Sequence, residues 1–530
     1  MSVIKANGAG DPVSSDFYNG ATSRSLRMQN ARLTRTASST GNPKKWTLSV
    51  WLKRTSLGSS YIFSASPLGS GYDGLASIYF NASDQLHTYY DTSGSNPYGA
   101  VDDGSRLYRD LGSWFHLCWA VDAANTIHKI WINNNLVSTN TSRYPPNVNY
   151  GMNNSGDETV IGDGSWDSYG SADFDGYMAE INFLDGQYLE PDSFAETKNG
   201  VWIPLKDPSL TYGTNGFRLQ VLATGTSADS SGIGADTSGQ GNHYSLTGLA
   251  GTDVVLDNPE NNFATMNPLD VGGAITYTEG NLKMVVSSGS MEGSRATMAL
   301  PQSGKWYWEV GVTSLGYISQ VGIATSEKKL ANTADGAADH IAWGFGTWMS
   351  TYNSSVSKYQ VNVGGSGGDN WVAQPASGDV LGIAYDADNG KLWFAKNGTY
   401  QNTSGTANPA TGDDPRASSL TGKEWFPLYA GYPEGSPAYT MNFGQDSSFA
   451  GTETAQGNTD GNGIGDFYYA PPSGYLALCS ANLPEPTIGP NSLTQADDYF
   501  NTVLYNGDSQ SSNAITGVGF QPDWLWIKRR

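Results

Sequence analysis

The chain has 530 residues and a formal net charge of −21, from 29 Lys and Arg against 50 Asp and Glu. This balance argues against nucleic acid or an anionic membrane as a partner, because contacts with phosphate groups need clustered Lys and Arg side chains. Only 15% of the residues are charged, 12% are aromatic, and the 65 Gly and 24 Pro are scattered, which indicates a folded, β-rich protein with a polar, uncharged surface.

The two cysteines, Cys118 and Cys479, lie far apart in the chain, so we expect no disulfide framework. Cys118 lies in the apolar stretch FHLCWAV and is predicted to be a small buried residue. The opening MSVIKANGAGDPV lacks the apolar core of a signal peptide, and no apolar run approaches the ~20 residues of a membrane span.

Residues 1–36 are polar and show little strand pattern, so we expect an N-terminal arm that serves as an anchor. Strand patterns begin at WTLSVWLKR, where alternate apolar residues fall on one face. These are Trp46, Leu48, Val50 and Leu52. Further short strand patterns and turns predict a β-sandwich over residues 37–250, which ends in a Gly-, Ser- and Thr-rich bridge.

A second run of strand patterns predicts another sandwich over residues 257–450. Residues 451–484, with GTETAQGNTDGNGIGD, read as a flexible linker by composition. Residues 485–530 read as a partial β unit, and because the chain stops on a strand pattern we expect a longer protein. The predicted fold class is therefore all-β, with two jelly-roll-like β-sandwich domains in tandem and the start of a third β unit.

Two stretches of the first unit carry a family resemblance. SWFHLCWAVDAANTIHKIWINNNLV and FDGYMAEINFLDGQYL resemble the central hairpin and the closing strand of laminin-G/concanavalin-like lectin domains. The resemblance covers about residues 37–196 and implies a lectin-like sandwich.

The second unit resembles a SPRY domain through KWYWEVGV, VGIAT, WGFG, GDVLGIAYDADNGKLWFAKNG, FPLYAGY and MNFGQ, in that order. In that family the hairpin GDVLGIAYDADNGKLWFAKNG is scaffold, and partners bind loops at one end of the sandwich. We therefore expect its apolar residues to fill a core, and Asp386 and Asp388 to complete a turn rather than bind calcium. The expected core residues are Leu381, Ile383, Leu392 and Phe394.

The order of the two domains is similar to that in tail fibres and other virion proteins of tailed bacteriophages. The resemblance implies a virion location in the tail or tail fibre, other virion proteins as partners, and a host surface glycan or protein as ligand. It also implies a homo-oligomer, and we expect a trimer. The apolar cluster of Phe467, Tyr468 and Tyr469 would pack either between chains or on a sandwich of its own chain.

Catalysis is not expected. A glycoside hydrolase needs paired carboxylates, and in AEINFLD the positions that share a face with Glu180 at period 2 are Asn182 and Leu184. Glu180 is predicted to be a hydrogen-bonded strand residue. The five histidines show no metal-ligand spacing, and His116 is predicted to pack within a strand.

The loop GDGSWDSYGSADFDG is the main candidate site. Its carboxylates resemble the calcium-bearing loop of pentraxin-like proteins, and oxygen ligands are what calcium requires; Asx-turn chemistry is the alternative. The candidate metal ligands are Asp163, Asp167, Asp173 and Asp175. For a sugar, the candidate ligand-binding residues are Trp166, Asp167 and Tyr169, since aromatic faces stack on sugar rings and carboxylates accept hydroxyl hydrogen bonds. No cofactor other than this calcium ion is expected, and DGNGIGD, Asp460 to Asp466, is a weaker calcium candidate.

The sequence thus predicts a non-enzymatic virion structural protein, a bacteriophage tail fibre that binds a carbohydrate or protein during host attachment. Two alternatives stay open at this point. One is a capsid or baseplate decoration protein with a purely structural role, and the other is a polysaccharide-degrading tailspike.

Overall fold

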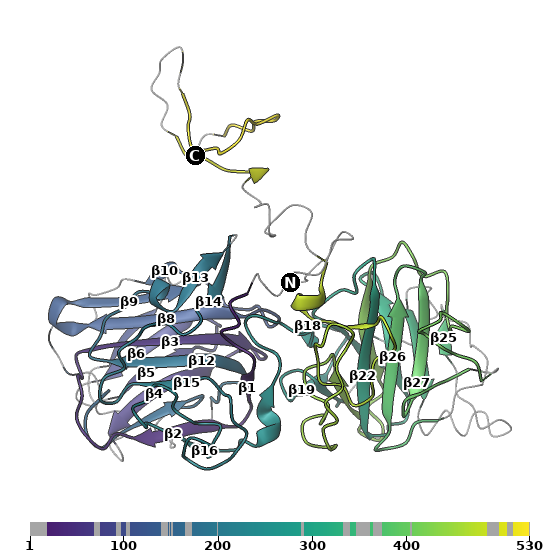
Figure 1. Cartoon of the computed structure of the whole chain (residues 1–530), viewed down its shortest axis with the longest axis horizontal. Coiled ribbons are helices and arrows are strands. Elements are labelled where there is room, and N and C mark those ends of the chain that lie inside the picture. The colour runs from purple at the N-terminus through teal and green to yellow at the C-terminus, as the bar shows by residue number, and fades with distance from the viewer. Residues whose placement is uncertain are drawn as a thin grey trace.

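The protein is described from a computed structural model. The described residues are 18–67, 75–91, 97–101, 106–138, 147, 149, 152–164, 172–198, 200–287, 291–331, 340–345, 361–363, 374–402, 405–484, 498–505, 512 and 514–528. The described residues between 18 and 484 form two β-sandwiches that lie side by side (Figure 1). The described residues between 498 and 528 belong to neither sandwich and contain no strand, so they give no support to the predicted partial β unit over residues 485–530. The predicted all-β fold class is confirmed. Among these residues, no helix is long and apolar enough to span a membrane.

The first sandwich is made of two antiparallel sheets. Across one sheet the strands are β10 (Asn135–Ser138), β9 (Ile127–Ile132), β8 (Phe115–Asp122), β3 (Lys45–Arg54), β12 (Gly176–Asp185), β1 (Ser25–Met28) and β17 (Val254–Val255), with β15 (Phe217–Leu219) also paired to β12. Across the other they are β16 (Ser245–Thr247), β2 (Arg32–Thr36), β11 (Asp157–Ile161), β4 (Ser60–Pro67), β5 (Ala76–Phe80), β6 (Leu86–Asp91) and β7 (Pro97–Val101). A hairpin of β13 (Ala195–Lys198) and β14 (Val201–Pro204) lies outside both sheets.

The second sandwich also has two sheets. One contains β18 (Met266–Val271), β21 (Glu292–Ala296), β29 (Trp425–Gly431), β23 (Ser319–Thr325), β24 (His340–Phe345) and β25 (Val361–Val363). The other contains β19 (Ile275–Thr278), β20 (Lys283–Val286), β30 (Ala438–Asn442), β22 (Lys305–Ser314), β26 (Val380–Asp386), β27 (Lys391–Lys396) and β28 (Thr399–Tyr400), with β31 (Leu476–Ala477) parallel to β22. The described helical segments are single 3₁₀ turns, η1 (Ala123–Asn125), η2 (Pro191–Ser193), η3 (Gly251–Asp253) and η4 (Ser480–Asn482).

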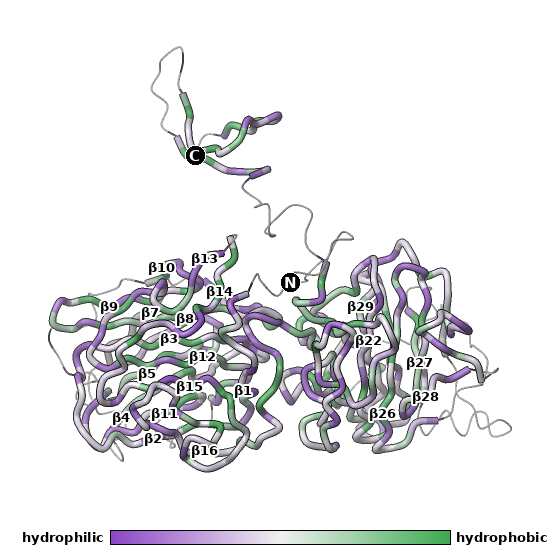
Figure 2. The backbone as a smooth tube through the Cα atoms, in the orientation of Figure 1, coloured by the Kyte–Doolittle hydropathy of each residue, from purple (hydrophilic) through white to green (hydrophobic). Residues whose placement is uncertain are grey.

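The apolar alternation read from the sequence does fill the cores. Trp46, Leu48, Val50 and Leu52 of β3 are all buried in the first core, where the Trp46 and Trp119 rings meet edge to face at 4.4 Å. In the second sandwich Leu381, Ile383, Leu392 and Phe394 are each 0% exposed, as predicted for the β26–β27 hairpin. Figure 2 shows apolar and polar residues alternating along the strands of both sandwiches.

The prediction of an N-terminal arm over residues 1–36 is wrong for its described part. Strand β1 pairs with β12 and β17, and β2 pairs with β11 and β16, so both strands belong to the first sandwich. Leu26, Met28 and Leu33 point into its core, and their burial against strands distant in the sequence explains why a short local pattern was not recognised. Residues 1–17 lie outside the described residues.

The prediction of a flexible linker over residues 451–484 is also wrong. Phe467, Tyr475 and Cys479 are fully buried against the outer face of the β22 sheet. Phe467 packs on Tyr307, with ring centroids 5.3 Å apart. The aromatic cluster therefore docks on a sandwich of its own chain, as one of the two sequence interpretations expected, and gives no support to a trimer.

The two sandwiches are held together by buried polar contacts. Arg27 of β1 forms ion pairs with Asp253 and with two acids of the second half, Glu279 and Asp446. The Tyr177 hydroxyl donates to the carbonyl of Gly280 at 2.8 Å. These contacts fix the relative orientation of the two sandwiches, because sliding one past the other would leave the Arg27 charge and the Tyr177 hydroxyl without these partners.

Candidate functional site

The acidic loop of the first sandwich connects β11 to β12. Asp163 follows β11, and its carboxylate accepts hydrogen bonds from the Arg32 guanidinium at 2.9 Å and from the backbone N–H of Gly164 at 2.6 Å. Asp173 lies next to it. Burial and the carboxylate of Asp163 raise the pKa of Asp173 to about 6.

Asp175 lies directly before β12, and its charge also contributes to the raised pKa of Asp173. Its backbone carbonyl accepts from the N–H of Thr55 at 3.1 Å. Burial raises the pKa of its carboxyl, and a hydrogen bond from the Ser56 hydroxyl opposes that rise. Burial therefore makes ionisation of the Asp173 and Asp175 carboxyls unfavourable at this edge of the sandwich.

The structure describes part of the predicted calcium site. Three of its four ligands, Asp163, Asp173 and Asp175, are described, and within the described residues no group of three or more His, Cys, Asp or Glu is arranged to hold a metal ion. Arg32 already compensates Asp163. A calcium site here depends on Asp167, which lies outside the described residues, and it stays a prediction.

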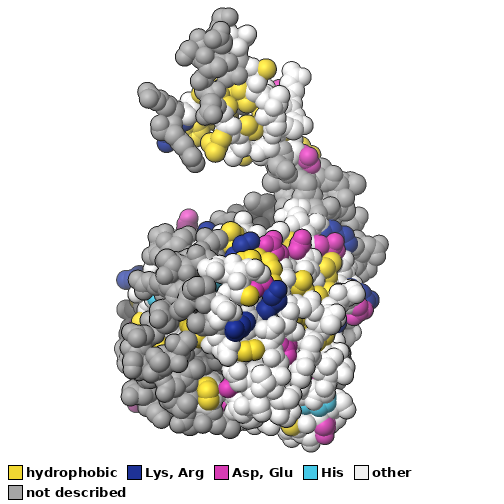
Figure 3. Space-filling model, turned by 90° about the vertical axis from the view of Figure 1, so that its left-hand side faces the viewer, with side chains coloured by type: hydrophobic (Ala, Val, Ile, Leu, Met, Phe, Trp, Pro, Cys, Tyr) yellow, Lys and Arg dark blue, Asp and Glu magenta, His cyan; other side chains and the backbone are white. Residues whose placement is uncertain are grey.

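The predicted sugar-binding residues Trp166, Asp167 and Tyr169 also lie outside the described residues. The nearest described residues on either side of them are Gly164 and Ala172. Figure 3 shows one end of this sandwich, where the visible described surface is largely neither charged nor apolar.

Glu180 on β12 is a paired structural residue. It sits in a β-bulge with φ of +46°, and its carboxylate accepts from Arg218 Nε at 3.0 Å and from Gln220 at 3.2 Å. The side chain is buried, and its neighbour Asn182 accepts from the Tyr212 hydroxyl. Glu180 is thus a hydrogen-bonded strand residue, as predicted, on a face that residues 186–212 cover.

The other polar residues singled out from the sequence also have structural partners. His116 is fully buried between the Ser49 hydroxyl and the Trp202 indole, and burial lowers its pKa to about 3. Asp386 accepts from the backbone and side chain of Asn389, and Asp388 accepts from the N–H of Gly304. These contacts confirm the packed histidine and the turn at the hairpin.

The weaker calcium candidate is a closed turn. Asp460 accepts from the backbone N–H groups of Asn462, Ile464 and Ala477 and from the side chain of Asn482. These hydrogen bonds form the Asx-turn arrangement that is the alternative to calcium, and binding of an ion by this segment stays a prediction.

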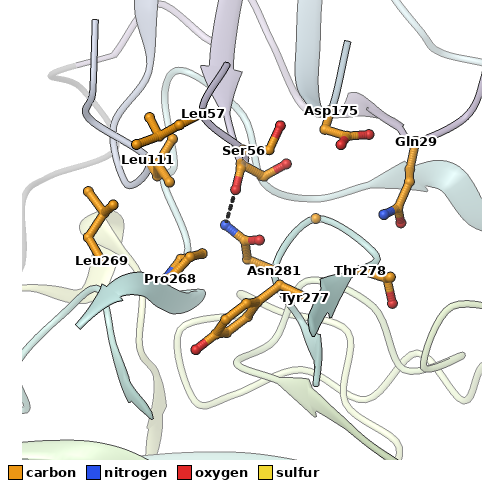
Figure 4. A pocket seen from close by; sticks show the side chains of 12 residues that line it. Gln29, Ser56, Leu57, Leu111, Asp175, Pro268, Leu269, Tyr277, Thr278 and Asn281 are labelled. Atoms are coloured by element: carbon orange, nitrogen blue, oxygen red, sulfur yellow. Dashed lines mark hydrogen bonds between the residues drawn. The ribbon is translucent and has the colours of Figure 1, made fainter. Parts of the chain in front are cut away.

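The residues that line one cavity could not be recognised as a site from the sequence. A cavity of about 340 Å³ lies between the two sandwiches (Figure 4). Its lining residues are Gln29, Thr55, Ser56, Leu57, Leu111, Asp175, Pro268, Leu269, Tyr277, Thr278, Gly280 and Asn281. Only Asp175 was singled out from the sequence, because the cavity exists only when the two sandwiches meet.

Comparison with known families agrees with both domain resemblances. Residues 28–192 match the family described as the concanavalin A-like lectin/glucanases superfamily, and residues 305–413 match the SPRY domain. Residues 495–530 match a domain of unknown function, DUF7483. The chain thus contains one segment similar to the concanavalin A-like superfamily and one segment similar to the SPRY domain.

Solved structures with similar folds include the SPRY domain of human HERC1, with 13% identity, a TM-score of 0.25, and coverage of 33% of this chain and 96% of that one. A heptameric SAP-like pentraxin from Limulus polyphemus has 18% identity, a TM-score of 0.24, and coverage of 31% and 76%. A putative carbohydrate binding protein from Bacteroides ovatus has 14% identity, a TM-score of 0.31, and coverage of 43% and 59%. A search of curated proteins found no match.

Proposed function

We propose that the chain is a non-enzymatic structural protein of a virion, a bacteriophage tail fibre that binds a host surface glycan or protein during attachment. Two domains of binding type in one chain support a recognition role. The order of a lectin-like domain and a SPRY domain, which is similar to that in tail-fibre proteins, supports the virion location.

The observation that carries the proposal is the pairing of Glu180 with Arg218. The superfamily matched by residues 28–192 includes both lectins and glucanases. A glucanase needs two carboxylates that face its substrate. Glu180 instead lies 6% exposed against Arg218, and Asn182 and Leu184 supply no second acid. This arrangement supports the lectin alternative within the superfamily.

The test measures binding and turnover together. The purified chain is applied to immobilised host surface polysaccharide, and both retained protein and newly released reducing ends are quantified. We expect saturable binding without release of reducing ends. Release of reducing ends would favour the tailspike, and immunogold labelling of the capsid or baseplate without any glycan binding would favour the decoration protein.

The position of the sugar site is tested separately. Trp166→Ala combined with Asp167→Ala should abolish adsorption to host cells while thermal unfolding stays unchanged, because stacking and hydroxyl contacts are both removed. The matched control is Trp526→Ala with Asp523→Ala, in the exposed C-terminal segment. Unchanged adsorption of the first variant would move the site to the loops of the SPRY domain.

A further inference from the structure

The cavity between the two sandwiches has a rigid, preformed wall. Asn281 donates its side-chain N–H to the carbonyl of Thr55 at 2.8 Å, the bond drawn in Figure 4. The backbone N–H of Glu279 donates to Gln29 at 2.6 Å. Gly280 has φ of +67°, and a Cβ there would lie 2.0 Å from the Tyr177 hydroxyl, so a glycine is needed for this close approach. Because these contacts cross the interface, the cavity keeps its shape without a ligand.

One side of the cavity carries an uncompensated negative charge. Asp175 lines the cavity on the same side as Gln29 (Figure 4). The Ser56 hydroxyl donates a hydrogen bond to the Asp175 carboxylate. Among the described residues, no Lys or Arg side chain forms an ion pair with Asp175. The nearby guanidinium groups are already used, since Arg27 pairs with Glu279 and Asp446 and Arg32 pairs with Asp163.

The other side of the cavity is apolar. Leu57 from the first sandwich and Leu269 from the second are 39% and 41% exposed, and they stand with Leu111 and Pro268 on the side away from Asp175 (Figure 4). Two exposed leucines at the mouth of a cavity are apolar surface that a ligand can cover.

We propose that this cavity binds a primary ammonium group carried on an aliphatic stem, as in the lysine side chain of a partner protein or in a free diamine. The ammonium group donates to the Asp175 carboxylate, and the stem lies along Leu57 and Leu269. A charged amine forms a charge-assisted hydrogen bond with a carboxylate, while its methylene groups remain in apolar contact.

Other ligand classes fit this cavity less well. An anion would be repelled by Asp175, and a neutral sugar would leave that charge uncompensated in a partly buried position. A divalent cation requires several oxygen ligands from the protein, whereas Asp175 is the single carboxylate among the lining residues. The inference does not rest on the proposed sugar-binding residues Trp166, Asp167 and Tyr169, and it shares one residue, Asp175, with the predicted calcium site.

The experiment uses the full chain and titrates it with Nα-acetyl-lysine methylamide, followed by calorimetry or NMR. The matched probe is the same compound acetylated at Nε, which keeps the stem and loses the charge. We expect saturable binding of the first probe and at least about tenfold weaker binding of the second. Equal binding of both probes, or binding of neither, would overturn the proposal.

Variants locate the site. Asp175→Asn should weaken binding of the lysine probe by about tenfold or more, as should Leu57→Ser at the exposed mouth. Asp192→Asn, on the exposed η2 turn, makes the same chemical change elsewhere and should bind like wild type. Thermal unfolding of each variant checks folding. Wild-type affinity in both Asp175→Asn and Leu57→Ser would contradict the assigned site.

A third titration shows whether the bound amine belongs to a protein side chain or to a free diamine. 1,5-Diaminopentane presents the same ammonium and stem without a peptide backbone. Tighter binding of a lysine-containing peptide than of the diamine would indicate a protein partner, and the reverse order would indicate a free diamine. Either order is consistent with the proposed chemistry only if Asp175→Asn weakens both ligands.

Discussion

The Nζ atom of Lys53 lies 2.7 Å from Oδ2 of Asp257, and neither side chain is exposed to solvent. Lys53 belongs to β3 of the first sandwich, whereas Asp257 opens the segment that leads into the second. The ammonium group also donates to Asn262 and to the carbonyl of Phe263, and Trp114 donates to the other Asp257 oxygen. All three ammonium donors are thus used at the interface between the domains.

Replacing Lys53 by Met should strongly destabilise the protein. The substitution leaves Asp257 buried without its counter-ion, and breaking a buried pair in this way costs about 3–5 kcal/mol. Urea unfolding followed by tryptophan fluorescence measures the change. Adding Asp257→Asn should restore part of the loss, because the uncompensated charge is then gone.

Lys44→Met is the matched control for this prediction. Among the described residues, the partner of the Lys44 amine is Asn147, through an exposed hydrogen bond, so loss of the amine should cost less than about 1 kcal/mol. A Lys53→Met variant no less stable than Lys44→Met would show that the buried pair does not stabilise the interface.

Glu309 of β22 should make stability depend on pH. Its carboxylate accepts from the backbone N–H groups of Tyr468 and Tyr469, and from Tyr307 and Asn442, yet burial raises its pKa to about 7. The ordinary value is 4.5, so the folded state binds the proton more tightly than the unfolded state. The contribution of Glu309 to stability is full below about pH 4.5 and falls by about 3 kcal/mol as pH rises through 7.

Glu309→Gln isolates that contribution. At about pH 5 the variant should be less stable than wild type by roughly 1–3 kcal/mol. The amide nitrogen of glutamine is a hydrogen-bond donor, and it would face the N–H groups of Tyr468, Tyr469 and Asn442, which are donors too. This difference should shrink as pH rises to about 8, since only the wild-type group titrates. Urea unfolding at both pH values measures it, and a difference that widens with pH would contradict the prediction.

Both cysteines should be unreactive in the folded protein. Cys118 and Cys479 are fully buried, and burial raises the pKa of the Cys479 thiol to about 12 and that of Cys118 well above its ordinary value. Since the thiolate is the reactive form, a thiol-specific dye at about pH 8 should label the chain only in urea. Rapid labelling without denaturant would show that these regions open.

The sequence patterns predicted those parts of the fold whose signal is local. The alternation in β3, the turn in the β26–β27 hairpin, and the burial of His116 and Cys118 all follow from neighbouring residues. Strands β1 and β2 were missed because they are short and their partners, such as β12 and β17, lie more than a hundred residues away. The loop after Ala450 was misread because composition reports flexibility, whereas Asp460 fixes the turn by accepting backbone hydrogen bonds.

In the candidate site too, the sequence predicted the features that depend on neighbouring residues and missed those that depend on distant ones. The acidic loop was found from its residue types, and the structure brings Asp163 and Asp173 together there. The partner that neutralises Glu180, Arg218, is 38 positions away, and no pattern around either residue predicts the pair. The cavity beside Asp175 depends on the docking of two domains, which no single stretch of sequence encodes.

Asp173 should oppose folding more strongly as pH rises. Its folded-state pKa of about 6 exceeds the ordinary 3.8 because of burial and Asp163, so the folded state prefers the protonated form. The stability associated with that proton is present below about pH 4 and is lost as pH rises through 6. Asp173→Asn, which cannot ionise, should therefore gain melting temperature relative to wild type between about pH 4 and pH 7. Asp192→Asn, exposed on η2, should show no such trend.

A few millimolar calcium at neutral pH tests the predicted metal site by the same measurement of melting temperature. An ion held by Asp163, Asp167, Asp173 and Asp175 would raise the melting temperature of wild type and not that of Asp173→Asn. If calcium shifts neither protein while the pH trend holds, the carboxylates are close together without forming a calcium site.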